Sequence, residues 1–295
     1  MSEDRFLAAV AAHLTEGQGK GGQRNDVARL TAAYREGLSS SSVDTSAYLT
    51  ARLPATYAAV SAVLAEVNRL RPLFQPRTMV DAGAGPGSGS WAAARRWETI
   101  GDFTLVDRDS RFLDLAGKLL ATSGEASLAA ARLVLGNFAD MTSRGDLVIC
   151  SYALAEVPLE RVARVAERLW QSTNELLVLV EPGTPAGFDR ILAARRQLLA
   201  MGTHMVGPCA GTRECPLQAP DWCHFAVRLA RDRRHMHAKG AVVPFEDEKF
   251  SWLAVSRQPG AAAAARVLAP PRRGKAAIGL KLCTPTGLAE RDVAR

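Results

Sequence analysis

Between residues 78 and 181, short apolar runs alternate with helix-like segments, and few folds accommodate that pattern. The apolar runs predict strands at 78–82, 103–107, 132–135, 146–151 and 176–181. Apolar residues at helical spacing occupy the intervening segments, near 88–98, 110–121 and 159–171. Strands that alternate with helices build a mainly parallel sheet with helices on both faces. We therefore expect a doubly wound, Rossmann-like α/β domain.

Four regions are expected along the chain. They are an N-terminal helical region at 1–76, the Rossmann-like core at 77–185, a helix with a Cys- and Arg-rich segment at 186–249, and final strands at 250–295. In the first region 6–10 and 58–64 have helical spacing, whereas 17–22 and 39–42 are loop-like. In the last region, strand candidates at 250–257 and 277–283 are expected to complete the sheet.

Composition excludes some classes of protein. The 295 residues include no run of about 18 apolar residues, so no transmembrane helix is expected. The first five residues are acidic on balance and resemble neither a signal peptide nor a transit peptide. Five cysteines are too few for a secreted disulfide scaffold. These features favour a cytoplasmic protein that does not contact a membrane.

A glycine-rich loop follows the first predicted strand. It carries Asp81, Gly83, Gly85 and Gly87, and glycines there let backbone N–H groups approach a ligand closely. A dinucleotide fingerprint would need a glycine at Ser88. The loop instead resembles motif I of class I methyltransferases, which implies S-adenosylmethionine as the cofactor.

Further residues fit the same cofactor. Asp107 ends the second predicted strand, where a carboxylate can accept the hydroxyls of a ribose. Asn137 and Phe138 follow the third strand, where the methyltransferase resemblance implies adenine contacts. The fourth strand lacks the Asn/Asp-Pro-Pro-aromatic motif of enzymes that methylate exocyclic base nitrogens. Cys150 at that strand fits inert packing better than a nucleophile, so no catalytic residue is assigned.

Four of the cysteines gather in the last 90 residues: Cys209, Cys215, Cys223 and Cys283. In a reducing compartment such a set points to metal rather than to disulfides. The spacing is wider than the C-x₂₋₄-C of common zinc sites, which favours a [4Fe–4S] cluster. A Cys₃His zinc site that uses His224 remains an alternative, as do four unrelated buried cysteines.

Several segments carry a closer resemblance. They include 47–57 (AYLTARLPATY), 207–209 (GPC), 215–217 (CPL), 221–225 (DWCHF), 245–252 (FEDEKFSW) and 280–284 (LKLCT). In this order they resemble the methyltransferase-like family associated with the mitochondrial small ribosomal subunit, in its bacterial form, over roughly 30–295. The resemblance implies a [4Fe–4S] site at the four cysteines and a role on or with small-subunit ribosomal RNA. It implies no secure catalytic assignment.

The net charge of +7 is unevenly distributed. Residues 186–295 hold 18 Lys/Arg and 9 Asp/Glu, whereas 1–185 are slightly acidic. Clustered basic charge indicates a phosphate-rich partner. The predicted RNA-binding residues are Arg228, Arg231, Arg233, Arg234 and Lys239. Trp222 and Phe225 are expected to shield the metal site rather than to stack on bases.

Three functions follow from these features. The first is an S-adenosylmethionine-dependent methyltransferase that acts on small-subunit ribosomal RNA, with a structural [4Fe–4S] cluster. The second is a non-catalytic assembly factor that uses the methyltransferase fold to bind a ribosomal assembly intermediate. The third, a small-molecule methyltransferase with a zinc-stabilised lid, is disfavoured by the basic charge. DNA is not expected as a partner.

Overall fold

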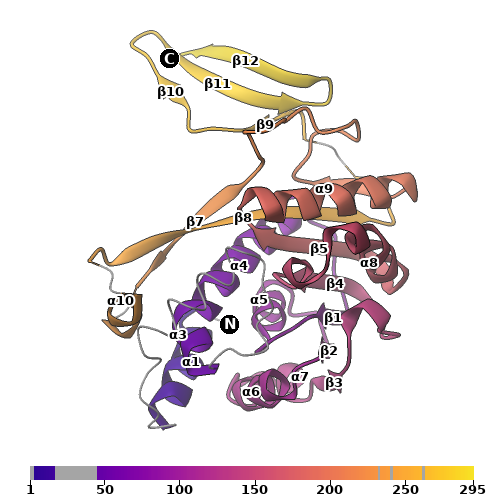
Figure 1. Ribbon diagram of the computed structural model, residues 1–295, viewed down its shortest axis with the longest axis vertical. Coiled ribbons are helices and arrows are strands. Elements are labelled where there is room, and N and C mark those ends of the chain that lie inside the picture. Colours follow the sequence, from indigo (N-terminus) through magenta and orange to yellow (C-terminus); the bar gives the residue numbers. More distant parts are fainter. Residues whose placement is uncertain (1–2, 17–44, 232, 240–241, 261–262) are drawn as a thin grey trace.

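The computed structural model of this protein describes residues 3–16, 45–231, 233–239, 242–260 and 263–295 (Figure 1). The loops expected at 17–22 and 39–42 lie outside the described residues. Within them, the strands form two sheets, one of eight strands and one of four. The larger sheet is the centre of the fold, and the smaller one stands away from it at the C-terminal end of the chain.

The main sheet has the order β3-β2-β1-β4-β5-β8-β6, and β7 pairs with β8 outside this path. Its strands are β1 (Thr78–Ala82), β2 (Asp102–Asp107), β3 (Arg132–Leu135), β4 (Gly145–Ser151), β5 (Thr173–Pro182), β6 (His204–Gly207), β7 (Phe225–Ala230) and β8 (Phe245–Ser256). Strands β1 to β5 are parallel, whereas β8 runs antiparallel to β5 and β6. This Rossmann-like order, with one reversed strand after β5, is the class I methyltransferase fold. The predicted α/β class is confirmed.

Helices cover both faces of the main sheet, because its central strands are apolar on both sides. On β4, Leu147 and Ile149 face one core and Val148 and Cys150 face the other. The first core is covered by α1 (Glu3–Glu16), α3 (Thr45–Ala51), α4 (Leu53–Leu70), α5 (Ser88–Arg96) and α6 (Ser110–Ala121). The second is covered by α8 (Leu159–Gln171) and α9 (Pro185–Ala200).

The remaining described elements are short. They are α7 (Ala126–Ala129), the 3₁₀ turns η1 (Phe138–Asp140) and η2 (Leu154–Glu156), and α10 (Arg233–Lys239) between β7 and β8. None of the described helices is both long enough and apolar enough to cross a membrane.

The C-terminal strands differ from the expectation. The strand expected at 277–283 does not complete the main sheet but forms a second sheet. That sheet contains β9 (Arg266–Val267), β10 (Arg272–Arg273), β11 (Ala277–Thr284) and β12 (Gly287–Ala294). Strand β8 also begins at Phe245, before the expected boundary at 249/250. Its first half pairs with β7 and its second half with β5 and β6, so one strand joins two expected regions.

Candidate functional site

A cavity of about 490 Å³ opens beyond the carboxyl ends of β1, β2 and β4. Open α/β sheets bind their ligands at this edge, and the volume lies within the range of small-molecule sites. Four of the predicted cofactor residues line it: Gly83, Gly85, Asp107 and Phe138. The fold therefore brings together residues that are far apart in the sequence, at the place where a cofactor is expected.

The glycine loop needs its glycines for conformation and for space. Gly83 has a φ of 71° and Gly85 a φ of 52°, values that side chains with a Cβ rarely adopt. A Cβ at Gly83 would lie 2.5 Å from the Cβ of Ala153, which follows β4. The loop can therefore approach the end of β4 only without a side chain at this position.

Asp107 is held by backbone donors from two loops. Its Oδ2 accepts the N–H of Gly85 at 2.8 Å, and its Oδ1 accepts the N–H of Asp109 at 2.9 Å. Burial raises the pKa of this carboxyl, and the two N–H groups partly offset that shift. The carboxylate is thereby oriented on the cavity wall, where further lone pairs can accept hydroxyl protons.

The other predicted cofactor residues do not line the cavity. Asp81 is fully buried, and its Oδ2 accepts both the backbone N–H and the hydroxyl of Ser90, at 2.8 and 2.9 Å. Burial raises the pKa of Asp81 to about 7. Gly87 precedes α5 with a φ of 86°, and the side chain of Asn137 accepts the N–H of Ala139. These three residues shape the loops around the cavity.

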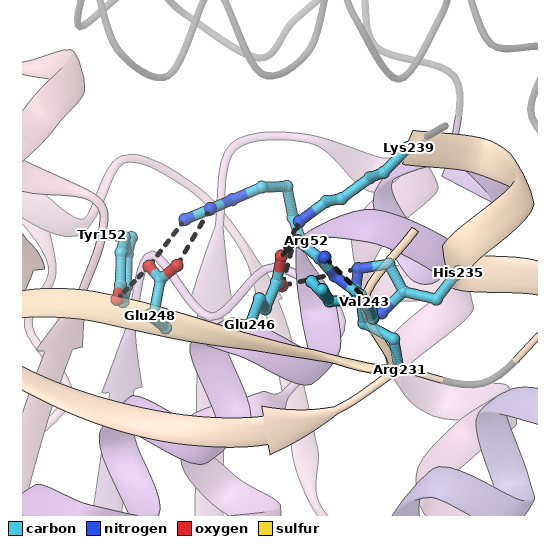
Figure 2. Close-up of polar contacts among 8 residues, drawn as sticks. All are labelled: Arg52, Tyr152, Arg231, His235, Lys239, Val243, Glu246 and Glu248. Carbon is cyan, nitrogen blue, oxygen red and sulfur yellow. Dashed lines mark hydrogen bonds and ion pairs between the residues drawn. The ribbon is translucent and has the colours of Figure 1, made fainter. Parts of the chain in front are cut away.

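Tyr152, which sequence reasoning missed, forms the wall after β4. Its φ of 58° is unusual for a residue with a bulky side chain. Its hydroxyl donates to Glu248 Oε1 at 2.9 Å, and the Glu248 carboxylate pairs with Arg52 at 3.3 Å (Figure 2). Both partners of the ion pair are nearly buried. The cavity is thus tied to β8 and to the residue that precedes α4.

A second ion pair lies at the cavity. The guanidinium of Arg108 donates to the Glu156 carboxylate at 2.6 Å, and both residues line the cavity. They come from the end of β2 and from η2, so the pair joins two sides of the site.

Cys150 is fully buried, and burial raises the pKa of its thiol well above the ordinary value. This environment suits packing and not nucleophilic attack.

The four C-terminal cysteines come into one neighbourhood. Cys209, Cys215 and Cys283 line a small cavity of about 130 Å³ between the loop after β6 and β11. Burial raises the pKa of the Cys223 thiol to about 11; the nearby thiols of Cys209 and Cys215 add to the shift, and Arg266 opposes it. Cys223 therefore lies in the same neighbourhood as Cys209 and Cys215.

In this structure the described cysteine side chains are not arranged as metal ligands. Among the described residues, no three Cys, His, Asp or Glu side chains are arranged so that they could hold a metal ion. The Cys223 thiol contacts the guanidinium of Arg266. His224 Nδ1 lies 3.3 Å from the carbonyl oxygen of Trp222. The metal-binding segment predicted from the sequence is therefore not supported by this geometry.

Comparison with known protein families identifies the family of this chain. The family described as "Mitochondrial small ribosomal subunit Rsm22" matches residues 42–295. The chain belongs to this family. The resemblance read from the sequence segments is thereby confirmed at the level of the family.

Relatives of this Rsm22-family protein include two curated mitochondrial proteins. It is 31% identical over 242 residues to the human "Ribosome assembly protein METTL17, mitochondrial", a match that covers 76% of the chain and 50% of the relative. It is 27% identical over 194 residues to the "Rsm22-cox11 tandem protein 2, mitochondrial" of Schizosaccharomyces pombe, which covers 58% of the chain and 25% of that protein. The chain thus spans half or less of the curated relatives it matches.

Solved structures similar to this family member include methyltransferases of low sequence identity. Magnesium protoporphyrin IX methyltransferase from Synechocystis PCC 6803, solved with bound SAM, has a TM-score of 0.46 and 14% identity, and covers 79% of this chain and 97% of the other. Precorrin-6y C5,15-methyltransferase from Geobacter metallireducens has a TM-score of 0.43 and 16% identity, and covers 66% and 86%.

The predicted RNA-binding run of this Rsm22-family protein is largely ion-paired. Arg231 and Lys239 both bind the Glu246 carboxylate, at 2.7 and 2.6 Å, and all three side chains are nearly buried (Figure 2). Arg228 is exposed but pairs with Asp247 at 2.7 Å. The side chains of Arg233 and Arg234 lie outside the described part. RNA binding by this run stays a prediction, and in this structure its three described cations already have anionic partners.

The aromatic residues near the cysteines contact other parts of the chain, and their expected role in shielding a metal site stays a prediction. Trp222 Nε1 donates to the carbonyl oxygen of Gly183 at 2.9 Å. Phe225 stacks on Phe250 at a centroid distance of 5.8 Å, and the guanidinium of Arg266 lies 3.6 Å from the centre of its ring. These contacts join the cysteine loops to β8.

Proposed function

We propose that this protein binds S-adenosylmethionine and assists the assembly of the small ribosomal subunit through contacts with its RNA. The observation that carries the proposal is a cavity of about 490 Å³ with a complete glycine loop and Asp107, in a chain of the Rsm22 family. The human relative is named as a ribosome assembly protein, which supports the assembly role. Action in the cytoplasm stays a prediction from the sequence.

The residues around the cavity fit the proposed cofactor. Asp107 would accept the ribose hydroxyls, because its carboxylate is oriented by two backbone N–H groups. Gly83 and Gly85 would let the backbone approach the methionine portion, and the ring of Phe138 offers an apolar face for the adenine. When bound, the cofactor supplies an electrophilic methyl group.

Methyl transfer to RNA is the finer form of the proposal. At the end of β4, Ser151, Tyr152 and Glu156 line the cavity, but none is assigned as a catalytic residue. Incubation with radiolabelled S-adenosylmethionine and purified small subunits tests this step directly. Label in the RNA supports a methyltransferase. Binding of the cofactor without label would favour an assembly protein that uses the fold as a binding platform.

The cofactor assignment is tested by calorimetry of S-adenosylmethionine binding. Asp107→Asn removes a charged acceptor, and such hydrogen bonds contribute about 1.5–3 kcal/mol, so the affinity should fall about 10- to 150-fold. Gly83→Ala should abolish binding, because its Cβ collides with Ala153. Asp102→Asn, at the exposed opposite end of β2, is the matched control and should bind normally. Failure of the unaltered protein to bind would refute the cofactor assignment.

We further propose that Cys209, Cys215, Cys223 and Cys283 hold a [4Fe–4S] cluster, with zinc as the alternative metal. The support is the donor set: four thiols, three of which line one small cavity while the fourth lies near them. Soft thiolate ligands favour iron–sulfur clusters and zinc. Anaerobic purification followed by iron, sulfide and zinc analysis tests the proposal. A protein that contains none of the three would refute it.

A further inference from the structure

The second sheet has little hydrophobic core of its own. Among the hydrophobic residues of β9 to β12, Leu282 alone is buried, whereas Val267, Leu288 and Val293 are about half exposed. The sheet is antiparallel, and it stands away from the main sheet beyond α9 (Figure 1). The sheet therefore presents much of its surface to solvent.

The two faces of this sheet differ in charge. Directly opposite residues of an antiparallel ladder point to the same face, so the register assigns every side chain. One face carries Cys283 and Lys281, and it is turned toward the cysteine loop, because Cys283 lines the cysteine cavity and Lys281 pairs with Asp221 at 3.2 Å. Both acidic residues of the sheet, Glu290 and Asp292, lie opposite Lys281 and Gly279 on this inner face.

The outer face is aliphatic and basic. It carries Ile278, Leu280, Val293 and, toward β9, the buried Leu282, and the register adds Arg273 opposite Ile278 and Arg291 opposite Leu280. All the acidic residues of the sheet lie on the other side. The outer face therefore has cations without a neighbouring anion of its own.

Most of the other basic residues in this region are already neutralised or engaged. Arg272 pairs with Glu290 at 2.8 Å on the inner face. Lys281 pairs with Asp221, and Arg266 contacts Cys223 and donates to the carbonyl oxygen of His224. These three contacts leave four exposed cations that have no ion pair within the described chain: Arg273, Lys275, Arg291 and Arg295.

These four cations lie close together in the sheet. Lys275 is in the turn between β10 and β11, where the N–H of Gly274 donates to the carbonyl oxygen of Ala277. The N–H of Arg295 donates to the carbonyl oxygen of Ala276 in the same turn. Arg273 precedes the turn, and Arg291 lies further along β12. We call Arg273, Lys275, Arg291 and Arg295 the cationic tip.

We propose that the cationic tip binds the phosphates of small-subunit ribosomal RNA. The inference rests on the proposed function and names the surface that makes the RNA contact. Unpaired arginines bind phosphate bidentately without first breaking an internal ion pair. The run at 228–239 differs, because Arg231 and Lys239 would have to leave the buried carboxylate of Glu246 to reach RNA. Compared with Arg231 and Lys239, the tip therefore offers cations that a phosphate can bind without displacing a carboxylate.

The test measures binding of the full-length protein to transcribed small-subunit ribosomal RNA at several salt concentrations. The tip variant replaces Arg273, Lys275 and Arg291 by Gln, which removes three charges and keeps long polar side chains. The control variant makes the same change at three exposed arginines of α8, Arg161, Arg164 and Arg168. Both variants have the same net charge, so only the position of the lost charge differs. Circular dichroism verifies that both are folded.

The tip variant should bind RNA at least about tenfold more weakly, and the slope of log affinity against log salt should flatten by about 2, because each lost phosphate contact in single-stranded RNA changes that slope by about 0.7. The α8 control should change neither quantity appreciably. Equal effects in both variants would overturn the tip, because net charge alone would then explain them.

Three other results would also overturn the inference. Unchanged affinity and slope in the tip variant, with RNA binding by the unaltered protein intact, would refute the tip but not the proposed function. If the unaltered protein does not bind RNA, both fail. A tip variant that retains RNA binding but loses a ribosomal protein from a reconstituted small subunit would assign the sheet to a protein partner instead.

Discussion

Replacement of Glu246 by Gln tests what the basic residues around it do. Glu246 is at the start of β8, and its carboxylate accepts hydrogen bonds from Arg231 at 2.7 Å and from Lys239 at 2.6 Å (Figure 2). His235 Nε2 lies 3.4 Å away. The side chains of Arg231, Lys239 and Glu246 are only 14%, 16% and 11% exposed. One buried anion therefore holds together β7, α10 and β8.

The expected loss of stability follows from this burial. Glu246→Gln removes the anion that Arg231 and Lys239 share, and breaking a buried ion pair in this way costs about 3 kcal/mol. Burial raises the pKa of Glu246, but hydrogen bonds from His235, Lys239 and Arg231 outweigh it and hold the pKa far below its ordinary value of 4.5. The ionised carboxylate thus stabilises the fold above about pH 4.5, and this contribution is lost as the pH falls further.

Urea denaturation followed by tryptophan fluorescence measures the difference. At pH 7 the variant should have a lower free energy of unfolding by about 3 kcal/mol, and the gap should narrow below pH 4.5 because Gln does not titrate. Asp247→Asn is the control: it is the next residue, on the opposite face of β8, and its pair with Arg228 is exposed. Equal stability of Glu246→Gln and the unaltered protein at pH 7 would show that the buried pairing is not structural.

Two further predictions concern the cysteines and the cavity wall. Replacement of any one of Cys209, Cys215, Cys223 or Cys283 by Ser should lower the metal content, whereas Cys150→Ala should retain it; full occupancy in Cys283→Ser would remove β11 from the proposed site. Tyr152→Phe deletes the hydroxyl that donates to Glu248 and should lower the free energy of unfolding by about 1 kcal/mol. A Tyr152→Phe protein as stable as the unaltered one would mean that this bond does not tie the cavity to β8.

The sequence predicted the central strands well, because a buried parallel strand needs an uninterrupted apolar run. The runs at 78–82, 146–151 and 176–181 appear as β1, β4 and β5 with nearly the same limits. The start of β8 was missed. Its residues Glu246, Asp247 and Glu248 precede the strand expected at 250–257, and in the structure cations from β7, α10 and the residue before α4 pair with them. Such compensation depends on tertiary contacts that a local pattern does not contain.

The cavity was predicted in part for a similar reason. Gly83 and Gly85 come just after β1 and Asp107 ends β2, so the β–α pattern alone places them at one edge of the sheet. Tyr48 also lines the cavity, but it comes from α3, which packs there from a distant part of the chain. Tyr152 lines it through a left-handed backbone conformation, which cannot be predicted from a tyrosine in the sequence. The loops that carry the glycines and the carboxylate can be predicted from the sequence, whereas the opposite wall of the cavity cannot.

The placement of the basic residues shows the limit of a charge count. The count correctly located the excess in residues 186–295, and local density then favoured 228–239 as the RNA contact. In the β7–β8 ladder, however, Arg228 lies directly opposite Asp247, and Leu229 lies opposite Glu246. The acidic residues of β8 therefore neutralise the basic residues of the run at 228–239 beside them. The cations of the cationic tip, in contrast, are exposed and have no ionic partner in the described C-terminal sheet. A phosphate can bind these residues without displacing a carboxylate, whereas Arg228, Arg231 and Lys239 would each have to leave a carboxylate partner first.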